Sequence, residues 1–344
     1  MAENKIKVAI IGYGNLGKGV KKAINRNPDM ELVGIITRRP EVVKKIEKDI
    51  PVFSFENFKV LADVAILCGG SKEDIFGPEN NRDIERIRIP DPYSYGQGLY
   101  FAQFFNTVDS FDTHRRIVDY YQQIGKIAKI NRHTSVISGG WDPGTFSVER
   151  VLADAFFPGS KIYTFWGPGI SQGHSDAVRQ VPGVRDARSY TIPIKSALRE
   201  VKKGRNPALK PQMMHKRIVY VVAHPDADKK DIARRIKQMP NYFAEYDTKI
   251  VFVSEEELKQ KHRAFPHQGS VILSGSTGSG NKALIEYHCE WDSNPEATAS
   301  ILVACARACY RLHNEKRYGA FTMLDIPPVY YSPYSSHELI KNYM

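Results

Sequence analysis

The chain has 344 residues, of which 42% are hydrophobic and 25% are charged, and this balance predicts an ordinary globular protein of two domains rather than a disordered or fibrous one. No run approaches the ~18 consecutive apolar residues of a membrane span, and the first residues lack the pattern of a signal peptide, so we expect a cytoplasmic protein with no membrane partner. The net charge of +11 comes from dispersed lysines and arginines, which we interpret as solvated helix faces rather than a nucleic-acid surface; it suits an anionic small substrate equally well.

Strand-like and helix-like segments alternate through the first 140 residues. The apolar runs that predict strands cover residues 6–12, 31–37, 64–70 and 134–140, and the segments that predict helices cover residues 15–27, 40–48, 100–106 and 114–128. Continuous apolar strands between helices indicate a parallel sheet with both faces covered. Residues 1–140 are therefore predicted to form a Rossmann-type, doubly wound α/β domain that binds a dinucleotide.

The character of the chain changes near residue 160 to β-rich segments. Strands are predicted at residues 161–167, 217–223, 249–254, 270–276 and 283–291, with basic helices near 194–204 and 228–239. This pattern predicts a second, α+β domain with a mixed sheet over residues 141–295. A helix near 296–313 and an apolar segment at 319–327 follow, and we expect residues 296–344 to pack back on the first domain.

The first predicted strand runs directly into a glycine-rich loop, GYGNLG. The first glycine permits a tight turn, the second lets a pyrophosphate approach the backbone, and the third lets the following helix pack close to the sheet. The helix N-terminus offers unpaired N–H groups to the phosphates. Because the loop follows a predicted strand and opens a predicted helix, it predicts a dinucleotide site rather than a purely structural turn. The residues assigned to this loop are Gly12, Tyr13, Gly14, Asn15, Leu16 and Gly17.

The end of the second predicted strand favours NADP over NAD as the cofactor. An NAD site normally places an Asp or Glu about 20 residues after the loop to bind the ribose 2′-hydroxyl, whereas this chain has Thr37, Arg38 and Arg39 there. Two guanidiniums and a hydroxyl suit a 2′-phosphate, although the structural alternative is that both arginines are solvated. The third predicted strand ends in four further residues that we assign to cofactor binding: Cys68, Gly69, Gly70 and Ser71.

The sequence argues against metal and hydrolase chemistry. The four cysteines form no CxxC pair and lie in apolar segments, so we expect neither a disulfide framework nor a zinc site. His174 and His267 have no HxH, HExxH or Cys/His cluster beside them, so we expect no metal. Ser171 and Ser175 lie near His174 but lack the GxSxG elbow of a hydrolase.

Polar residues interrupt the apolar pattern in six short clusters, two of them at the carboxyl ends of predicted parallel strands, where open α/β sheets bind their ligands. The clusters are DSFDTH (109–114), GGWDPGTF (139–146), FWGPGISQGHSD (165–176), MHKR (214–217), FPHQG (265–269) and SNPEATAS (293–300). Together with GYGNLG and MPNYF (239–243), they resemble the meso-diaminopimelate dehydrogenase family over essentially the whole chain. Enzymes of this family use NADP to deaminate oxidatively the D-centre of meso-2,6-diaminopimelate.

The resemblance implies a reversible reaction of lysine biosynthesis that yields ammonia and L-2-amino-6-oxopimelate, which cyclises to tetrahydrodipicolinate. It also implies a homodimer whose second domain serves dimerisation and substrate binding. Residue by residue, it implies that Asp112 and Asp142 are catalytic at the D-centre. The substrate-binding residues that it implies are Trp141, Trp166 (which shapes the D-centre pocket), Gln172 and Gly173 and, for the distal L-centre, Thr191, Arg217, His267 and Asn294.

The residue types fit this chemistry. A substrate with two ammonium groups and two carboxylates needs carboxylates at one kind of site and a guanidinium at another, because a charged group left unpaired in a closed pocket is costly. Asp112 and Asp142 can bind the ammonium and Arg217 a carboxylate, and either aspartate or a bound water can accept the proton. Each residue also has a structural alternative: either aspartate can cap a helix, and Arg217 can be an exposed charge at a strand end.

The chain departs from the family pattern after Asp74 and Ile75, where a long insert precedes the next helix. Loops of more than about 12–15 residues are uncommon unless they are functional or disordered. We expect residues 76–96 to form a surface excursion at the mouth of the cofactor cleft rather than part of the sheet, with a lid as the alternative. Thr145 and Gln268 also differ from the pattern; Gln268 replaces a glycine, which restricts backbone φ or narrows the distal pocket and allows shifted selectivity.

Other functions remain compatible with the sequence. They are a D-amino acid dehydrogenase of altered selectivity, a dihydrodipicolinate reductase-like or other two-domain NADP oxidoreductase, and a non-catalytic NADP sensor. A sugar dehydrogenase of the glucose-fructose type would show a Glu-Lys-Pro segment, and none occurs. A sensor with a degraded site would lack Asp112, Asp142 or Arg217, and all three are present.

Overall fold

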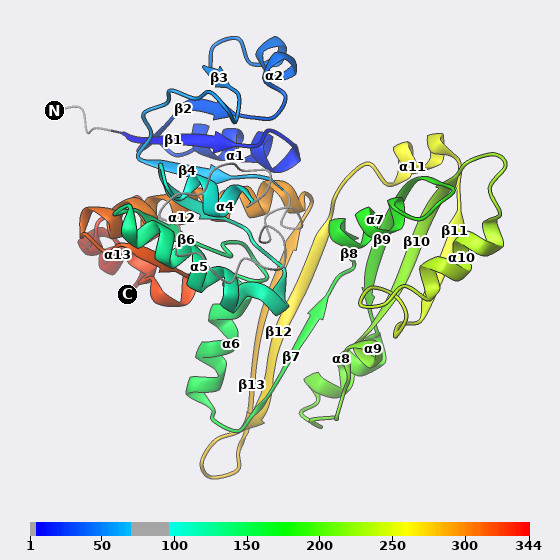
Figure 1. The fold of residues 1–344 in the computed structure, drawn as a ribbon. Helices are drawn as coiled ribbons and strands as arrows, with labels where there is room; N and C mark the ends of the chain where they lie inside the picture. The colour runs from blue at the N-terminus through cyan, green and yellow to red at the C-terminus, as the bar shows by residue number, and fades with distance from the viewer. Residues whose placement is uncertain (1–4, 70–95) are drawn as a thin grey trace. The chain divides into compact units, whose positions relative to one another are not determined.

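The computed structural model describes residues 5–69 and 96–344 (Figure 1). The chain divides into two compact units, residues 1–148 with 295–344 (unit 1) and residues 149–294 (unit 2). The domain boundaries expected from the sequence, near residues 140 and 295, stay a prediction. Within the described ranges, no helix combines the length and the apolar character needed to cross a membrane.

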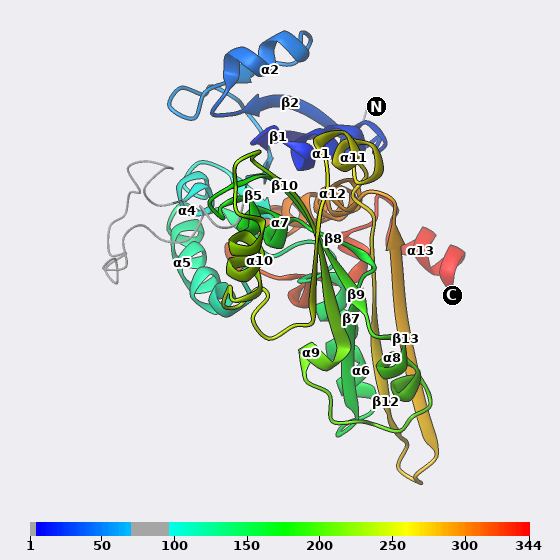
Figure 2. The same cartoon turned by 90° about the vertical axis from the view of Figure 1, so that its right-hand side faces the viewer.

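The described part of unit 1 is built on a parallel sheet of seven strands in the order β14-β6-β5-β4-β1-β2-β3 (Figures 1 and 2). The strands are β1 (Ile6–Ile11), β2 (Met30–Ile36), β3 (Val52–Phe53), β4 (Val64–Leu67), β5 (Asn106–Asp109), β6 (Thr134–Val136) and β14 (Gly319–Phe321). The chain builds outward from β1 on one side and then, from β4, on the other, so the strand order reverses at β1. Ligands of such sheets bind beyond the carboxyl ends of the strands at this reversal. The predicted Rossmann-type fold is confirmed.

Helices cover both faces of this sheet, because successive residues of a strand point to opposite faces. Val8 and Ile10 of β1 pack in one core cluster with α1 (Asn15–Asn25) and α12 (Asn294–Asn314). Ala9 and Ile11 pack on the other face with Phe101 of α4 (Gln97–Phe101), and α5 (Ile117–Ile130) packs against α4 in a further buried cluster. The other helices among the described residues of unit 1 are α2 (Pro40–Ile46), α13 (Ser336–Tyr343) and the short 3₁₀ helices η2 (His114–Arg116), η3 (Met323–Asp325) and η4 (Pro328–Tyr330).

The sequence prediction is wrong between residues 100 and 109. Helix α4 ends at residue 101 rather than near 106, and strand β5, which the sequence analysis does not predict, follows it. The first residue of β5 is polar, and its side chain forms hydrogen bonds inside the sheet. The Asn106 side-chain amide donates to Asp63 O at 2.8 Å and accepts the Thr134 N–H at 2.9 Å. Strand β6 also stops earlier than expected, because Ser138 has a φ of 54°, a left-handed conformation that cannot continue a strand.

A buried arginine fixes the C-terminal elements to the rest of unit 1. Arg307 of α12 is 2% exposed and donates to both carboxylate oxygens of Asp29, at 2.6 and 2.8 Å, and to Asn27 Oδ1 and Tyr331 O, both at 2.7 Å. Burial raises the pKa of Asp29, but the hydrogen bonds and charge of Arg307 outweigh it and hold that pKa below its ordinary value. These bonds join α12 to the turn before β2 and to the segment after η4.

Unit 2 contains a mixed four-stranded sheet, in the order β11-β10-β9-β8, and an antiparallel three-stranded sheet, in the order β13-β12-β7. The strands are β7 (Lys161–Trp166), β8 (Gly169–Ser171), β9 (Val184–Pro193), β10 (His215–Ala223), β11 (Thr248–Phe252), β12 (His267–Ser276) and β13 (Lys282–Trp291). The helices are α6 (Thr145–Phe156), which begins in unit 1, α7 (Gln172–Arg179), α8 (Lys195–Lys202), α9 (Pro211–Met214), α10 (Lys229–Lys237) and α11 (Glu255–Lys261). The predicted α+β class with a mixed sheet is confirmed, although the strands divide between two sheets and β9 is missed by the sequence analysis.

Candidate active site

The loop between β1 and α1 has the backbone geometry that its three glycines predict. Gly12 has a φ of +89°, and a Cβ added there would lie 3.2 Å from backbone atoms of Cys68 and Gly69. A Cβ on Gly17 would lie 2.3 Å from the carbonyl oxygen of Gly12, so only glycine lets α1 approach the strand end this closely. Gly14 precedes α1 with no atom within 4 Å of an added Cβ, and it provides no side-chain cap. The first turn of α1 thus presents its N–H groups at an open position.

Two side chains brace this loop against the end of α2. The Tyr13 hydroxyl donates to Glu47 Oε1 at 2.5 Å, and Lys21 of α1 forms an ion pair with the other oxygen of that carboxylate. Burial raises the pKa of Glu47, but the bonds from Lys21 and Tyr13 outweigh burial and lower it. Leu16 packs against the core, whereas Asn15 is exposed. Tyr13 is recognisable from the glycine-rich motif, whereas Glu47 is not, because 34 residues separate the two along the chain.

The arginines of the predicted 2′-phosphate site follow β2. Thr37 is buried, and its hydroxyl accepts the Arg39 N–H at 3.3 Å. The side chains of Arg38 and Arg39 are exposed at this strand end. Because β2 is the parallel neighbour of β1, its carboxyl end lies at the same edge of the sheet as the glycine-rich loop. After β4, Cys68 is buried next to Gly12, whereas Gly70 and Ser71 lie outside the described residues.

Asp112 and Asp142 follow neighbouring strands. β5 and β6 are parallel partners, so the loops that carry the two carboxylates leave the same edge of the sheet. Asp112 is exposed and forms no hydrogen bond or ion pair within the described chain; Thr113 is the N-cap of the helix after it, so the alternative in which Asp112 caps that helix is wrong. Asp142 is half-buried beside Trp141, whose ring packs edge-on against Phe146 at 5.2 Å.

A third carboxylate, which the sequence analysis does not assign, lies at the base of both loops. Asp109 is the last residue of β5 and is 4% exposed. Its Oδ1 accepts the N–H groups of Phe111 at 3.0 Å and Ser138 at 2.9 Å, and its Oδ2 accepts the Tyr120 hydroxyl at 2.7 Å. Burial raises the pKa of Asp109 above its ordinary value, because its effect outweighs the lowering effect of these three bonds.

Arg217 is a buried cation of unit 2. It lies on β10, is 6% exposed, and donates to the hydroxyl of Thr191, its register partner on β9. Its guanidinium carbon lies 4.3 Å from the centre of the Tyr246 ring. Its Nε is buried without a hydrogen-bond partner, no carboxylate of the described residues forms an ion pair with it, and burial lowers its pKa. The alternative in which Arg217 is an exposed charge is therefore wrong.

Glycines bring further predicted residues close to Arg217 and Thr191, and we call these side chains together the unit 2 cluster. Gly167 has a φ of +89°, and a Cβ there would lie 2.0 Å from the Thr191 carbonyl oxygen. A Cβ on Gly169 would lie 2.6 Å from His267 Cγ, so β8 can lie against His267 only because residue 169 is a glycine. Trp166 ends strand β7, which pairs with β12, the strand that His267 begins. The predicted side chains gathered at these strand ends are Trp166, Thr191, Arg217 and His267.

His215, which the sequence analysis does not assign, supports Trp166. It is fully buried on β10, and its Nε2 accepts the main-chain N–H of Trp166 at 2.9 Å. Its Nδ1 lies 3.2 Å from Pro211 O, so Nδ1 carries the proton. Burial lowers the pKa of His215 to about 4 despite the bond to Pro211, so the ring is neutral at neutral pH. Its ring packs on the Trp166 indole with centroids 5.1 Å apart.

The remaining predicted residues lie at element ends. Gln172 and Gly173 open α7 and are exposed. Asn294 opens α12, and its N–H donates to Phe265 O at 2.8 Å, close in the chain to His267. The restriction on φ expected where a glutamine replaces a family glycine does not arise, because residue 268 lies in the extended strand β12 and has no positive φ.

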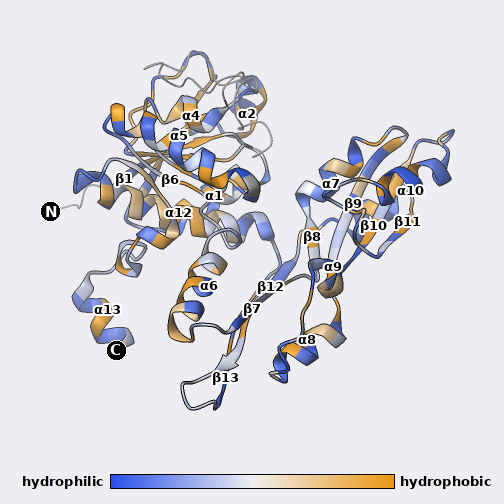
Figure 3. Cartoon of the chain, turned by 60° about the horizontal axis from the view of Figure 1, so that its bottom comes forward, coloured by the Kyte–Doolittle hydropathy of each residue, from blue (hydrophilic) through white to orange (hydrophobic). Residues whose placement is uncertain are grey.

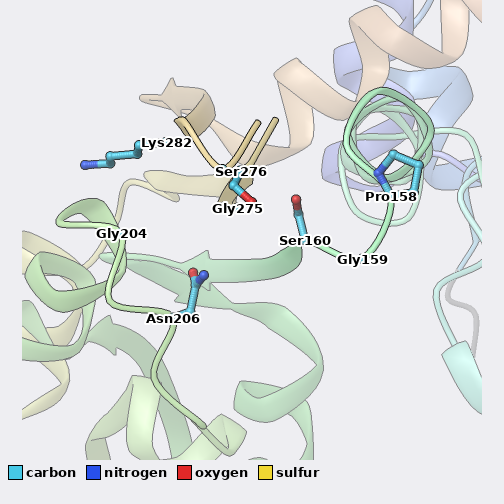
Figure 4. Close-up of a pocket in the computed structure, with 9 residues that line it drawn as sticks. Pro158, Gly159, Ser160, Gly204, Asn206, Gly275, Ser276 and Lys282 are labelled. Carbon is cyan, nitrogen blue, oxygen red and sulfur yellow. The ribbon is translucent and has the colours of Figure 1, made fainter. Parts of the chain in front are cut away.

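A hollow of about 380 Å³ in unit 2 contains none of the predicted site residues (Figure 4). Its lining includes Ser276 and Lys282, register partners at one end of β12 and β13, whereas His267 and Trp291 are partners at the other end. β12 has 10 residues, and at about 3.4 Å per residue its ends lie about 30 Å apart. The hollow is therefore separate from the cluster around Arg217.

Comparisons with known proteins identify the family. The meso-diaminopimelate D-dehydrogenase of Acetivibrio thermocellus is 47% identical, over 98% of this chain and 97% of that protein. The chain belongs to the meso-diaminopimelate dehydrogenase family. The model for the diaminopimelic acid dehydrogenase C-terminal domain matches residues 140–293. The resemblance drawn from the sequence motifs is confirmed, and with it the enzyme class, an amino acid dehydrogenase.

Solved structures of this family are similar over almost all of the chain. The C. glutamicum DAP dehydrogenase in complex with DAP gives a TM-score of 0.87 at 38% identity, over 99% of this chain and 100% of that chain. An engineered D-amino acid dehydrogenase bound to NADP+ gives a TM-score of 0.83 at 37% identity, with the same coverage.

Proposed function

We propose that this protein oxidises the D-centre of meso-2,6-diaminopimelate with NADP+ and releases ammonia and L-2-amino-6-oxopimelate, which cyclises to tetrahydrodipicolinate. The observation that carries the proposal is Arg217, a buried guanidinium bonded to Thr191 and stacked on Tyr246 with no carboxylate partner in the described chain. An unpaired buried charge is costly, so this cluster is built to receive an anionic group, which a substrate carboxylate supplies. The reaction belongs to lysine biosynthesis, and we expect a cytoplasmic enzyme with a small-molecule partner rather than nucleic acid.

The carboxyl edge of the unit 1 sheet fits NADP. The open position at Gly14 and the start of α1 suit a pyrophosphate, and the exposed guanidiniums of Arg38 and Arg39 suit a ribose 2′-phosphate. When bound, the cofactor supplies the hydride acceptor. The similarity to an engineered relative bound to NADP+ supports this assignment.

Asp112 and Asp142 act on the D-amino group. As carboxylates at neighbouring strand ends they bind the ammonium and orient the D-Cα hydrogen for transfer. The bound ammonium first gives up a proton to water. Loss of hydride from the neutral amine then leaves a protonated imine, water adds to it, and ammonia departs. Asp112, which makes no bond within the described chain, accepts the proton released when water adds.

The unit 2 cluster binds the distal end of the substrate. Arg217 binds the distal carboxylate, and Thr191 fixes the direction of the guanidinium. His267 and Asn294 bind the distal amino-acid centre beside it. A D-amino acid dehydrogenase of shifted selectivity is a second candidate, because Gln268 stands beside His267 where the family has a glycine and because an engineered D-amino acid dehydrogenase is among the similar structures.

The enzyme is proposed to act as a homodimer that forms through unit 2. Helix α6 exposes Val151, Leu152 and Phe156, and β13 exposes Leu284; Figure 3 colours α6 as largely hydrophobic. Large apolar side chains exposed on one helix, as on α6, are typical of protein interfaces. Analytical ultracentrifugation tests the proposal: we expect a dimer at micromolar concentration, and a monomer at every concentration contradicts it.

The decisive experiment follows the absorbance of reduced nicotinamide with NADP+ and meso-diaminopimelate. We expect reduction of NADP+ with equimolar release of ammonia. Oxidation of simple D-amino acids without oxidation of meso-diaminopimelate selects the second candidate. NADP+ binding without turnover of either substrate indicates a sensor and contradicts both.

A further inference from the structure

One carboxylate oxygen holds two loops of unit 1. We define loop A as residues 110–113, which carries the first proposed catalytic aspartate, and loop B as residues 137–144, which carries the second. Oδ1 of Asp109 accepts the N–H of Phe111 in loop A and the N–H of Ser138 in loop B. Both bonds lie beyond Val108 and Val136, the last paired residues of β5 and β6, where one main-chain bond, from the Gly139 N–H to Asp109 O at 2.8 Å, also joins the strand end to loop B. The carboxylate bonds are the ones that reach loop A as well.

Loop B has a conformation that needs such support. Ser138 has a φ of 54°, which costs a residue with a side chain about 1 kcal/mol or more. Its hydroxyl is buried without a partner in the described residues, and its main-chain N–H donates to Asp109 Oδ1. A Cβ on Gly144 would lie 1.9 Å from the carbonyl oxygen of Gly140, so the loop closes tightly around Asp142.

Asp109 is itself held in one orientation. Its second oxygen accepts the hydroxyl of Tyr120, which is 1% exposed. The Tyr120 ring stacks on Phe111 with centroids 4.2 Å apart and an interplanar angle of 21°. A Cβ on Gly98 of α4 would lie 2.0 Å from the Tyr120 hydroxyl oxygen, so the hydroxyl reaches its position against α4 only because residue 98 is a glycine. The carboxylate cannot rotate without losing bonds to both loops.

A second polar contact between the same strands has a different role. The hydroxyls of Thr107 and Ser135 lie 2.8 Å apart inside the sheet, where these two residues are already register partners. This contact supports the sheet, whereas the Oδ1 bonds of Asp109 act on the loops. From this geometry we propose that Asp109 is a positioning residue for the hydride-transfer step, which fixes the Asp112 and Asp142 carboxylates relative to each other; the proposal rests on the function proposed above.

Two substitutions of Asp109 show whether its hydrogen-bond acceptors are needed or whether a buried side chain is enough. Asp109→Leu removes both acceptor oxygens and keeps the branching of the side chain, and Asp109→Asn keeps one oxygen for both N–H groups. We expect the leucine variant to lower kcat with meso-diaminopimelate on the order of 100-fold, with the Kd of NADP+ within about two-fold of the wild type, and the asparagine variant to restore most of kcat. Thr107→Val is the matched control, which should lower stability and leave kcat unchanged. A leucine variant that folds with wild-type kcat overturns the proposal, as does an equal loss of kcat in the control.

A spectroscopic measurement separates this proposal from the proposed function. The sequence has three tryptophans, so Trp166→Phe and Trp291→Phe together leave Trp141 as the reporter of loop B. We expect Asp109→Leu to increase acrylamide quenching of Trp141 and Asp109→Asn to leave it unchanged, whatever the substrate. Unchanged quenching in the leucine variant overturns the positioning role. Increased quenching in the leucine variant, together with a wild-type protein that is inactive on meso-diaminopimelate, overturns the proposed function alone.

A milder substitution covers the case in which Asp109→Leu fails to fold. Tyr120→Phe deletes one hydroxyl and leaves Asp109 free to rotate. It should lower kcat about 3- to 10-fold and increase Trp141 quenching, because the two N–H bonds then loosen. Wild-type kcat and quenching in this variant overturn the proposal.

Discussion

Replacing Arg217 with methionine should stabilise the ligand-free protein and impair the enzyme at the same time. The substitution removes a charge whose burial lowers its pKa and which has no acidic partner among the described residues. It also removes one hydrogen bond to Thr191 and the contact with the Tyr246 ring, each worth about 1 kcal/mol. Because taking an ion out of water costs several kcal/mol, the balance favours methionine, and we expect the free energy of unfolding of unit 2 to rise by about 1–3 kcal/mol.

The effect on substrate binding has the opposite sign. A hydrogen bond to a charged group contributes about 1.5–3 kcal/mol, so loss of the guanidinium should raise KM for meso-diaminopimelate about 10- to 150-fold. The Kd of NADP+ should not change, because the proposed cofactor residues all belong to unit 1.

Arg307→Met provides the matched control, since Arg307 is an equally buried arginine that does have a carboxylate partner, Asp29. That substitution leaves Asp29 uncompensated and should destabilise the protein by about 3 kcal/mol. Denaturant unfolding followed by circular dichroism and tryptophan emission measures both changes. Destabilisation by Arg217→Met as large as that by Arg307→Met would refute the argument that Arg217 is held ready for an anion.

Four further outcomes are expected. Neutral residues at Arg38 and Arg39 should weaken NADP+ binding about 10- to 100-fold and NAD+ binding far less, and equal losses in a fluorescence titration would argue against the 2′-phosphate assignment. The meso isomer of diaminopimelate should be oxidised and the LL isomer hardly at all; comparable turnover contradicts the assigned pocket. Asp29→Asn should cost about 2 kcal/mol of stability at neutral pH. Because the folded-state pKa of Asp29 is lowered, that stability is present above the ordinary carboxyl pKa of about 3.9 and is lost as the pH falls through the lowered value, so the melting curves of variant and wild type should converge in acid. Replacing residues 76–96, which lie almost wholly outside the described ranges, with a Pro-Glu pair should leave a folded, dimeric and active enzyme if they are an excursion; a change confined to KM or turnover identifies a lid, and failure to fold contradicts both.

The features that the sequence predicts correctly are those whose physical cause is local. The three glycines of the first loop lie within six residues, and the backbone angle and close approaches that they permit depend on immediate neighbours. The alternation of apolar strands with helices likewise reflects the burial of each strand on both faces. The Rossmann-type fold and the family can therefore be inferred from the order of the residues alone.

The features that the sequence analysis misses depend on partners distant in the chain. Strand β5 begins with Asn106, which is acceptable in a sheet only because Asp63 and Thr134 satisfy its amide. Asp109 and His215 stand inside quoted motifs, but their roles appear only when Ser138 and Trp166 are brought to them by folding. A single sequence shows the residue types and not these pairings.

The contact between Gly69 and Gln97 has a consequence for how this fold can vary. A Cβ on Gly69 would lie 2.3 Å from the side-chain nitrogen of Gln97, so the chain departs from the sheet and returns to it at adjoining points. Closing a flexible loop costs only about 0.6 kcal/mol more for each doubling of its length. Because β4 and α4 meet at this junction, we expect that peptides of different length can replace the segment between Gly69 and Gln97, and that a reporter peptide grafted there leaves the register of the seven described strands unchanged.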